Sequence, residues 1–211
     1  MIVLCGGEKG GTGKSTLATN LAVWLAHQGK DVLLVDTDRQ LTSSRWIDRR
    51  HALAEPLPEV RGAEKHGNVF HALRDWAARY DEVIVDAGGR DSEELRTALV
   101  AAQVVYLPLR ASQPDLETSL HMHELVTLAR SLNPNLTARW LLTLAPAGQH
   151  AADTHEARDV LRELPGIPLS GVIIHDRKIY RDAIATGHGV VELLNEKAQA
   201  EIDALGHEIY R

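Results

Sequence analysis

Short apolar runs alternate with longer amphipathic stretches along most of the chain. The apolar runs predict strands at Ile2–Cys5, Asp31–Val35, Glu82–Val85, Val104–Leu107, Ala138–Leu144 and Leu169–Ile174. The amphipathic stretches predict helices at Lys14–His27, Leu41–Ala54, Val69–Arg79, Ser92–Ala102, Leu116–Ser131, Thr154–Leu164, Ile179–Thr186 and Val190–Gly206. Such an alternation is typical of an α/β domain with a parallel sheet.

The predicted strands are apolar at consecutive positions, as in Val83-Ile84-Val85. Continuous apolar runs indicate strands that are covered by helices on both faces. The sequence therefore predicts a doubly wound, mostly parallel twisted sheet flanked by helices, in which a ligand binds beyond the carboxyl ends of the strands. Residues 55–67 are less regular, and we interpret them as a surface excursion with a brief strand around Val60.

Composition narrows the class of protein. The 211 residues fit a single domain over residues 1–211, and Cys5 is the one cysteine, which excludes a disulfide framework and a cysteine-based metal or iron–sulfur cluster within one chain. No apolar run approaches the ~20 residues that cross a bilayer, and no signal peptide precedes the first strand, so we expect a cytoplasmic protein. A formal net charge of −6 argues against a permanently basic nucleic-acid clamp.

A glycine-rich loop separates the first predicted strand from the first predicted helix. It reads Glu8-Lys9-Gly10-Gly11-Thr12-Gly13-Lys14-Ser15-Thr16. Glycines let the backbone approach an anion closely, and a helix that begins here points N–H groups and its positive end at that anion. Lys14 is suited to neutralise β- and γ-phosphates, and the Ser15 hydroxyl to ligate Mg²⁺. We therefore expect ATP phosphates to bind along Gly10, Gly11, Thr12, Gly13, Lys14, Ser15 and Thr16.

The loop departs from the usual P-loop in two ways. Glu8 stands where a glycine is usual, and a second lysine, Lys9, precedes the glycines. In this the chain resembles the ParA/MinD family of deviant Walker ATPases, whose loop reads Lys-Gly-Gly-x-Gly-Lys-Ser/Thr. The resemblance implies that Lys9 reaches across a dimer to the nucleotide of the partner subunit, in the manner of an arginine finger.

Two acidic segments follow later predicted strands. The run Asp36-Thr37-Asp38-Arg39-Gln40 resembles the family's Asp-x-Asp-Pro-Gln segment, which implies Asp36 on the metal side and Asp38 at the attacking water. Arg39 stands where the family usually has proline, so the turn lacks that restraint on φ. An apolar strand ending in Asp86 is a Walker B arrangement, and the resemblance implies that Asp86 holds Mg²⁺ through water.

The resemblance covers most of the chain and is nearest to the short ParA subgroup that includes ParF. It implies a dimer face on the helix from Asp115 onward and adenine binding near Thr143. It also implies contacts to DNA phosphates from the basic cluster of Arg177, Lys178 and Arg181. No helix-turn-helix domain precedes the loop, so operator-specific DNA binding is not expected.

The resemblance therefore implies a Mg-ATP-dependent ATPase that hydrolyses ATP to ADP and phosphate and forms a homodimer on ATP binding. Its expected partners are non-specific DNA and a small adaptor protein of the ParB or ParG type, which places the ATP-bound form on the nucleoid. The expected cargo is a plasmid, a chromosome locus or a protein cluster. Two alternatives stay open: a MinD-like positioning switch that does not act on DNA, and a P-loop small-molecule synthase. Acidic residues near the C-terminus disfavour a membrane partner.

Overall fold

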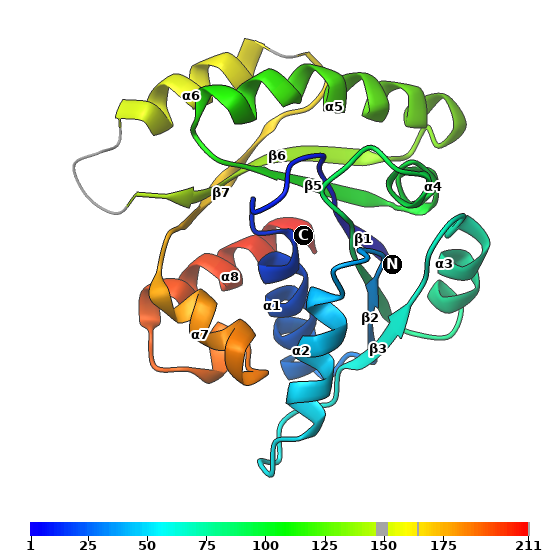
Figure 1. Cartoon of the computed structure of the whole chain (residues 1–211), viewed down its shortest axis with the longest axis vertical. Coiled ribbons are helices and arrows are strands. Elements are labelled where there is room, and N and C mark those ends of the chain that lie inside the picture. Colours follow the sequence, from blue (N-terminus) through cyan, green and yellow to red (C-terminus); the bar gives the residue numbers. More distant parts are fainter. Residues whose placement is uncertain (147–151, 164, 211) are drawn as a thin grey trace.

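Parallel strands form the central layer of the computed structural model, which describes residues 1–146, 152–163 and 165–210 (Figure 1). The strands are β1 (Ile2–Cys5), β2 (Val32–Asp36), β3 (Arg61–Glu64), β4 (Glu82–Asp86), β5 (Val104–Leu109), β6 (Thr137–Ala145) and β7 (Leu169–His175). They form one seven-stranded sheet in the order β3-β2-β4-β1-β5-β6-β7, and every pairing is parallel. The predicted fold class is confirmed.

Helices cover both faces of this sheet. They are α1 (Lys14–His27), α2 (Thr42–His51), α3 (Phe70–Ala77), α4 (Glu93–Ala101), α5 (Gln113–Leu132), α6 (Ala152–Glu163), α7 (Lys178–Thr186) and α8 (Glu196–Ile209), with a short 3₁₀ helix η1 (Val190–Glu192). Buried side chains of α3, α4, α5 and α6 pack on one face, and those of α1, α2, α7 and α8 pack on the other (Figure 1).

β1 shows why its apolar residues are consecutive. Ile2 and Leu4 lie in the apolar cluster beneath α3 to α6, whereas Val3 and Cys5 lie in the cluster beneath α1 and α8. Successive side chains of a strand point to opposite faces, and here each face is covered, so each position is apolar. Cys5 is fully buried and belongs to the core.

The last predicted helix is wrong in its first part. Residues 190–206 were expected to form one helix, but η1 ends at Glu192 and α8 begins at Glu196. The break has a local cause, because the side chain of Asn195 accepts a hydrogen bond from the backbone N–H of Ala198 and so starts a new helix. The end of the helix predicted at Thr154–Leu164 lies outside the described residues.

The brief strand expected around Val60 is present as β3, the edge strand beside β2. Within the described ranges, no helix combines the length and the apolarity needed to cross a membrane.

The strand order places a ligand site at one edge of the sheet. β1 and β5 are neighbours in the sheet, but the connections that follow them run in opposite directions. The connection after β1 leads to β2 in one half of the sheet, and the connection after β5 leads to β6 in the other half. Between two such strands the outgoing loops diverge, and ligands of doubly wound sheets bind in the crevice that results. Register aligns Asp36 with Asp86 and Asp86 with Cys5, so the ends of β2, β4 and β1 lie level beside this crevice.

Candidate functional site

A cavity of about 890 Å³ opens at the carboxyl edge of the sheet. Its volume lies within the range of small-molecule sites, roughly 300–1,000 Å³. The loop after β1, the loop after β2 and the loop after β4 supply most of the wall, with an apolar contribution from Leu144 and Ile184. The described wall includes Gly10, Gly11, Gly13, Lys14, Ser15, Thr16, Asp38, Arg39, Gly88, Gly89 and Arg90.

The conformation of the loop after β1 requires its glycines. Gly11 and Gly13 have φ values of 72° and 91°, in the left-handed region that disfavours other residues. Gly89, on the loop after β4, lies close to the backbone of Gly10. A Cβ at position 89 would lie only 2.8 Å from the backbone nitrogen of Gly10. The loops after β1 and β4 are therefore in direct backbone contact.

α1 presents its N-terminus to the cavity. Gly13 is the N-cap, no described side chain caps it, and the first turn carries no acidic residue. The N–H groups of a first turn have no partner within the helix, and they form an anion site together with the helix dipole. This end of the 14-residue helix fits a phosphate group.

Lys14 places a buried positive charge in the same loop. Its Nζ donates a hydrogen bond of 2.7 Å to the carbonyl oxygen of Lys9, and its side chain lines the cavity. Burial lowers the pKa of Lys14, while the carboxylates of Asp86 and Asp38 oppose that change. A phosphate anion in the cavity would supply the negative charge that this buried ammonium group favours.

Lys9 points to the other side of the loop. It lines a smaller pocket against α5, and its Nζ lies 3.5 Å from Oδ2 of Asp115. Asp115 is buried and also accepts a hydrogen bond from the Ser112 hydroxyl, while its Oδ1 meets no donor within the described part of the chain. The side chains of Lys9 and Lys14 therefore lie on different sides of the same loop.

Asp86 is a buried carboxylate with spare acceptor capacity. Oδ2 accepts a hydrogen bond of 2.7 Å from the Ser43 hydroxyl, and Oδ1 is buried without a donor among the described residues. Burial, together with the nearby Asp36 carboxylate, raises the pKa of Asp86 to about 7. The Ser15 hydroxyl lies close to the same carboxyl group. Oxygen ligands of these kinds fit Mg²⁺, directly or through water.

Asp36 and Asp38 have different surroundings. Asp36 is buried, and its two oxygens accept backbone N–H groups of Asp38 at 3.0 Å and Ser44 at 2.8 Å, so it holds the turn that leads into α2. Burial also raises the pKa of Asp36. Asp38 lines the cavity, beside Gly88, and its Oδ1 accepts the N–H of Gln40. Of the two carboxylates, Asp38 is the one that faces the open volume.

Thr143 lies beneath the phosphate loop. Its hydroxyl is buried and donates to the carbonyl oxygen of Thr12 at 2.8 Å, with a longer contact of 3.2 Å to that of Leu109. Its neighbour Leu144 lines the cavity. Thr143 therefore helps to hold the loop, and Leu144 is the residue of this strand end that lines the cavity.

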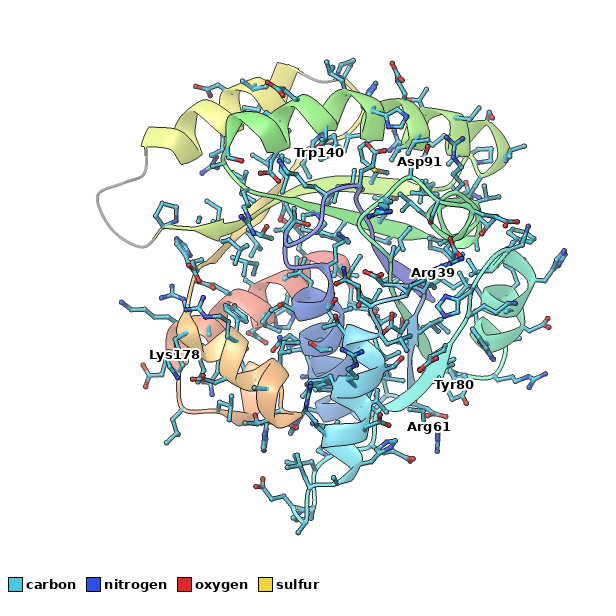
Figure 2. The ribbon with its side chains drawn as sticks, viewed as in Figure 1. Arg39, Arg61, Tyr80, Asp91, Trp140 and Lys178 are labelled. Carbon is cyan, nitrogen blue, oxygen red and sulfur yellow. The ribbon has the colours of Figure 1, made fainter. Side chains whose placement is uncertain are left out.

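The basic cluster on and before α7 is paired with acidic groups. Arg177 contacts Glu201 at 2.6 Å, Lys178 contacts Asp182 at 2.7 Å, and Arg181 contacts Asp176 at 2.5 Å. Lys178 and Arg181 are exposed, and Figure 2 shows Lys178 on the outer side of α7. Arg177 is largely covered, since its side chain is 19% exposed.

Sequence reasoning missed three groups that build this site. Ser43 holds Asp86, Asp115 holds Lys9, and Arg110 donates to the carbonyl oxygen of Gly11. No spacing rule links these residues to their partners, because each contact joins separate elements. The three-dimensional arrangement of these elements was needed to find the contacts.

The chain matches the model of the CobQ/CobB/MinD/ParA nucleotide binding domain over residues 2–190. It is 28% identical over 204 residues to "Maintenance of carboxysome distribution protein A" of Halothiobacillus neapolitanus, with 95% of this chain and 92% of the relative covered. It is 31% identical over 198 residues to the protein of the same name from Gloeobacter kilaueensis, with 92% and 86% covered. The solved structure of apo McdA from Cyanthece has a similar fold, with a TM-score of 0.78 at 17% identity and coverage of 99% and 98%.

Asp86→Asn is expected to stabilise the protein at pH 8 in the absence of nucleotide and Mg²⁺. The pKa of Asp86 is raised from an ordinary value of 3.8 to about 7, so the folded state binds this proton more tightly than the unfolded chain does. The contribution of this group to stability is therefore full below pH ~4 and is lost as the pH rises through about 7. An amide has no charge to bury, and we expect a gain of roughly 1–4 kcal/mol in the free energy of unfolding at pH 8.

Urea unfolding of both proteins in EDTA at pH 5 and pH 8 measures this difference. Asp75→Asn, at an exposed position of α3, is the matched control and should keep the wild-type pH dependence. Equal pH dependence of the wild type and Asp86→Asn would show that Asp86 carries no buried charge at pH 8.

Proposed function

The chain belongs to the CobQ/CobB/MinD/ParA family of nucleotide-binding domains, and we propose that it is a Mg-ATP-dependent switch of the ParA type that dimerises around ATP. The observation that carries this proposal is the division of labour between two lysines of one loop. Lys14 lines the chain's own cavity, whereas the side chain of Lys9 lies on the opposite side of the loop, against Asp115 of α5. A second positive charge outside its own cavity suits a phosphate group held by another subunit.

Each cavity group has a part in ATP hydrolysis. The backbone of Gly10 to Gly13 and the Lys14 ammonium group hold and neutralise the phosphates. The Ser15 hydroxyl and the Asp86 carboxylate would hold Mg²⁺, and Asp36 fixes the turn that leads into α2 beside them. A cation held there would supply charge neutralisation for the phosphates. Asp38 orients the attacking water from the loop after β2. No side chain forms a covalent intermediate in this reaction, so rate enhancement comes from positioning and charge.

The Lys9–Asp115 contact restrains the switch. For Lys9 to reach a partner's nucleotide, it leaves a carboxylate that is buried and that already has one unsatisfied oxygen. Loss of a cation from a buried carboxylate is unfavourable. The dimer therefore forms only when phosphate contacts offset this loss, which makes dimerisation depend on nucleotide.

The output that we propose is the positioning of a cargo, through a homodimer and a small adaptor protein. Two relatives are named for the maintenance of carboxysome distribution, and a name of this kind denotes a positioning protein. Both match this chain over nearly its whole length. These names favour a protein cluster among the three cargoes expected from the sequence, beside a plasmid and a chromosome locus. A synthase of small molecules leaves Lys9 without a part in the reaction, and we set it aside.

Non-specific DNA is the proposed track for the ATP-bound dimer. Lys178 and Arg181 are exposed, and DNA phosphates compete with their carboxylate partners on equal terms because surface ion pairs contribute little. Arg177 differs, since its guanidinium is largely covered and shares Glu201 with His175 and Tyr180. The pairing of all three basic residues favours, as a second candidate, a positioning switch that acts without DNA.

Asp115→Asn is expected to strengthen ATP-dependent dimerisation. Asparagine keeps the shape of the side chain and a hydrogen bond to Ser112, but lacks the charge that holds Lys9. Lys9 is partly exposed, so the ion pair is expected to contribute ~1 kcal/mol or less. This corresponds to a decrease of about two- to fivefold in the dimer dissociation constant for each pair that is removed. Sedimentation with ATP and Mg²⁺ measures it.

Glu117→Gln is the control, because it removes a negative charge from the same turn of α5 at an exposed position. It should leave dimerisation unchanged. Weaker dimerisation of Asp115→Asn than of the wild type would contradict a restraining role for this ion pair.

Joint replacement of Lys178 and Arg181 by alanine is expected to weaken DNA binding on all sequences alike and to flatten its salt dependence, because fewer counterions are released. Binding by the wild type should require ATP and Mg²⁺ and be absent with ADP. Arg177→Ala should instead lower the free energy of unfolding, since it leaves the carboxylate of Glu201 with one partner fewer.

Mobility shifts on unrelated duplexes at ~50 mM salt, where phosphate contacts are favoured, provide the measurement. Replacement of the exposed Lys30, Arg74 and Arg79 by alanine removes charge elsewhere and is the control. A wild-type protein that dimerises with ATP yet leaves DNA unshifted would reject the DNA track and favour the second candidate.

A further inference from the structure

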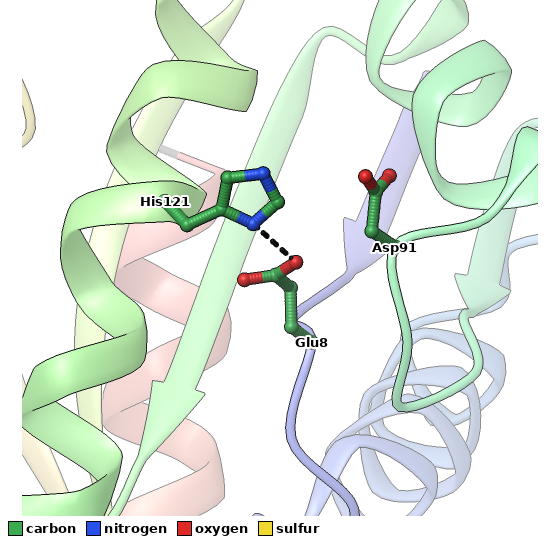
Figure 3. A group of neighbouring side chains, drawn as sticks. All are labelled: Glu8, Asp91 and His121. Atoms are coloured by element: carbon green, nitrogen blue, oxygen red, sulfur yellow. Dashed lines mark hydrogen bonds and ion pairs between the residues drawn. The ribbon is translucent and has the colours of Figure 1, made fainter.

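Glu8, Asp91 and His121 converge outside the nucleotide cavity (Figure 3). Glu8 belongs to the loop after β1, Asp91 to the loop after β4, and His121 to α5. One potential ligand atom of each residue lies within 4.8 Å of those of the other two. Residues far apart in the sequence thus bring an imidazole and two carboxylates to one point.

We propose that Glu8, Asp91 and His121 form a binding site for a divalent transition-metal cation, of which Zn²⁺ is the representative. Zn²⁺ takes nitrogen and oxygen ligands at ~2.0–2.2 Å, which separates the ligands of a tetrahedral site by roughly 3.4 Å. The ligand atoms all lie within 4.8 Å of one another, and those of His121 and Glu8 are 2.6 Å apart, so small movements, which separate this pair and bring Asp91 nearer, reach such distances. Water completes the coordination of a site with three protein ligands.

The choice of ligands favours this class of cation. Imidazole suits zinc, cobalt, nickel and copper, whereas Mg²⁺ and Ca²⁺ prefer oxygen ligands throughout. Two carboxylates and one neutral imidazole carry a charge of −2, which a divalent cation balances. Nδ1 of His121 already faces the cluster, at 2.6 Å from Oε1 of Glu8, so the nitrogen that would bind the cation is correctly directed.

Arg96 of α4 orients the third ligand. Its Nε donates to Oδ1 of Asp91 at 2.6 Å, and a second guanidinium nitrogen donates to Oδ2. Carboxylates that ligate a metal are commonly held by such hydrogen bonds, because an oxygen can accept a hydrogen bond and bind a cation at once. The positive charge of Arg96 opposes that of the cation, so we expect modest affinity.

The site is separate from the place of Mg²⁺ in the proposed function. The residues that line the nucleotide cavity do not include Glu8, Asp91 or His121. The site is nevertheless close to the cavity along the chain. Glu8 directly precedes Lys9, and Asp91 belongs to the same loop as Gly89, which packs on Gly10. A cation bound here would fasten both loops to α5, the helix that also carries Asp115. The inferred cation would therefore lie outside the nucleotide cavity and take no part in the chemistry proposed there.

Titration of the untagged, full-length protein with Co²⁺ tests the site, in the absence of nucleotide and Mg²⁺. Visible absorption of protein-bound Co²⁺ reports ligation, and competition with Zn²⁺ gives its relative affinity. We expect one Co²⁺ equivalent in the wild type that is lost or bound at least tenfold more weakly in His121→Ala. Glu8→Gln and Asp91→Asn should each weaken the same equivalent.

His123→Ala is the matched control. His123 lies on the same helix, is partly exposed, and contacts the carbonyl oxygen of Pro165 instead of the cluster. It should bind Co²⁺ as the wild type does. Equal titrations of the wild type and His121→Ala, or equal losses in His121→Ala and His123→Ala, would overturn the proposal in favour of general binding to exposed histidines. Circular dichroism confirms that each variant is folded, and because no nucleotide is present the result is independent of the proposed ATPase.

Discussion

The burial of charge beneath the carboxyl edge of the sheet is the constraint on which the rest of the structure depends. Lys14 and Asp86 are both buried, and one oxygen of Asp86 meets no donor in the part of the chain that the structure describes. Buried charges destabilise a fold unless partners satisfy them. A phosphate for Lys14 and a cation for Asp86 are complementary partners, so a single Mg-nucleotide satisfies both. The glycines, the open N-terminus of α1 and the strand register all serve to place this pair.

Contacts between loops extend that constraint across the molecule. Gly89 packs on the backbone of Gly10, and Asp38 lies beside Gly88, so the loops after β1, β2 and β4 are adjacent at the cavity. Lys9 then connects the first loop to α5 through Asp115. Movement of one of these elements displaces its neighbours, because the contacts are between backbones or involve buried groups. This connectivity supports the proposed nucleotide-dependent dimer.

Much of the fold could be predicted because local and global preferences agree. Ile2–Cys5 is apolar throughout since both faces of β1 are covered, and the glycine loop between a strand and a helix has one common use in proteins. Prediction of the helices failed at one place, for a local reason. The capping hydrogen bond of Asn195 split a continuous amphipathic pattern. Contacts between distant segments could not be predicted, because no local pattern links them; the hydrogen bond from the Thr143 hydroxyl to the carbonyl oxygen of Thr12 is an example. The ion pairs that Arg177, Lys178 and Arg181 form with acidic residues were not predicted from the basic cluster in the sequence either.

The division of labour between Lys14 and Lys9 is the central claim, and ATP titration of the two alanine variants tests it most directly. A charged hydrogen-bonding group among phosphates contributes ~1.5–3 kcal/mol, so Lys14→Ala should bind ATP at least tenfold more weakly than the wild type. Lys9→Ala should bind ATP with wild-type affinity at protein concentrations that keep the chain monomeric, because Lys9 lies outside its own cavity. Unchanged affinity in Lys14→Ala, or an equal loss in Lys9→Ala, would contradict the account.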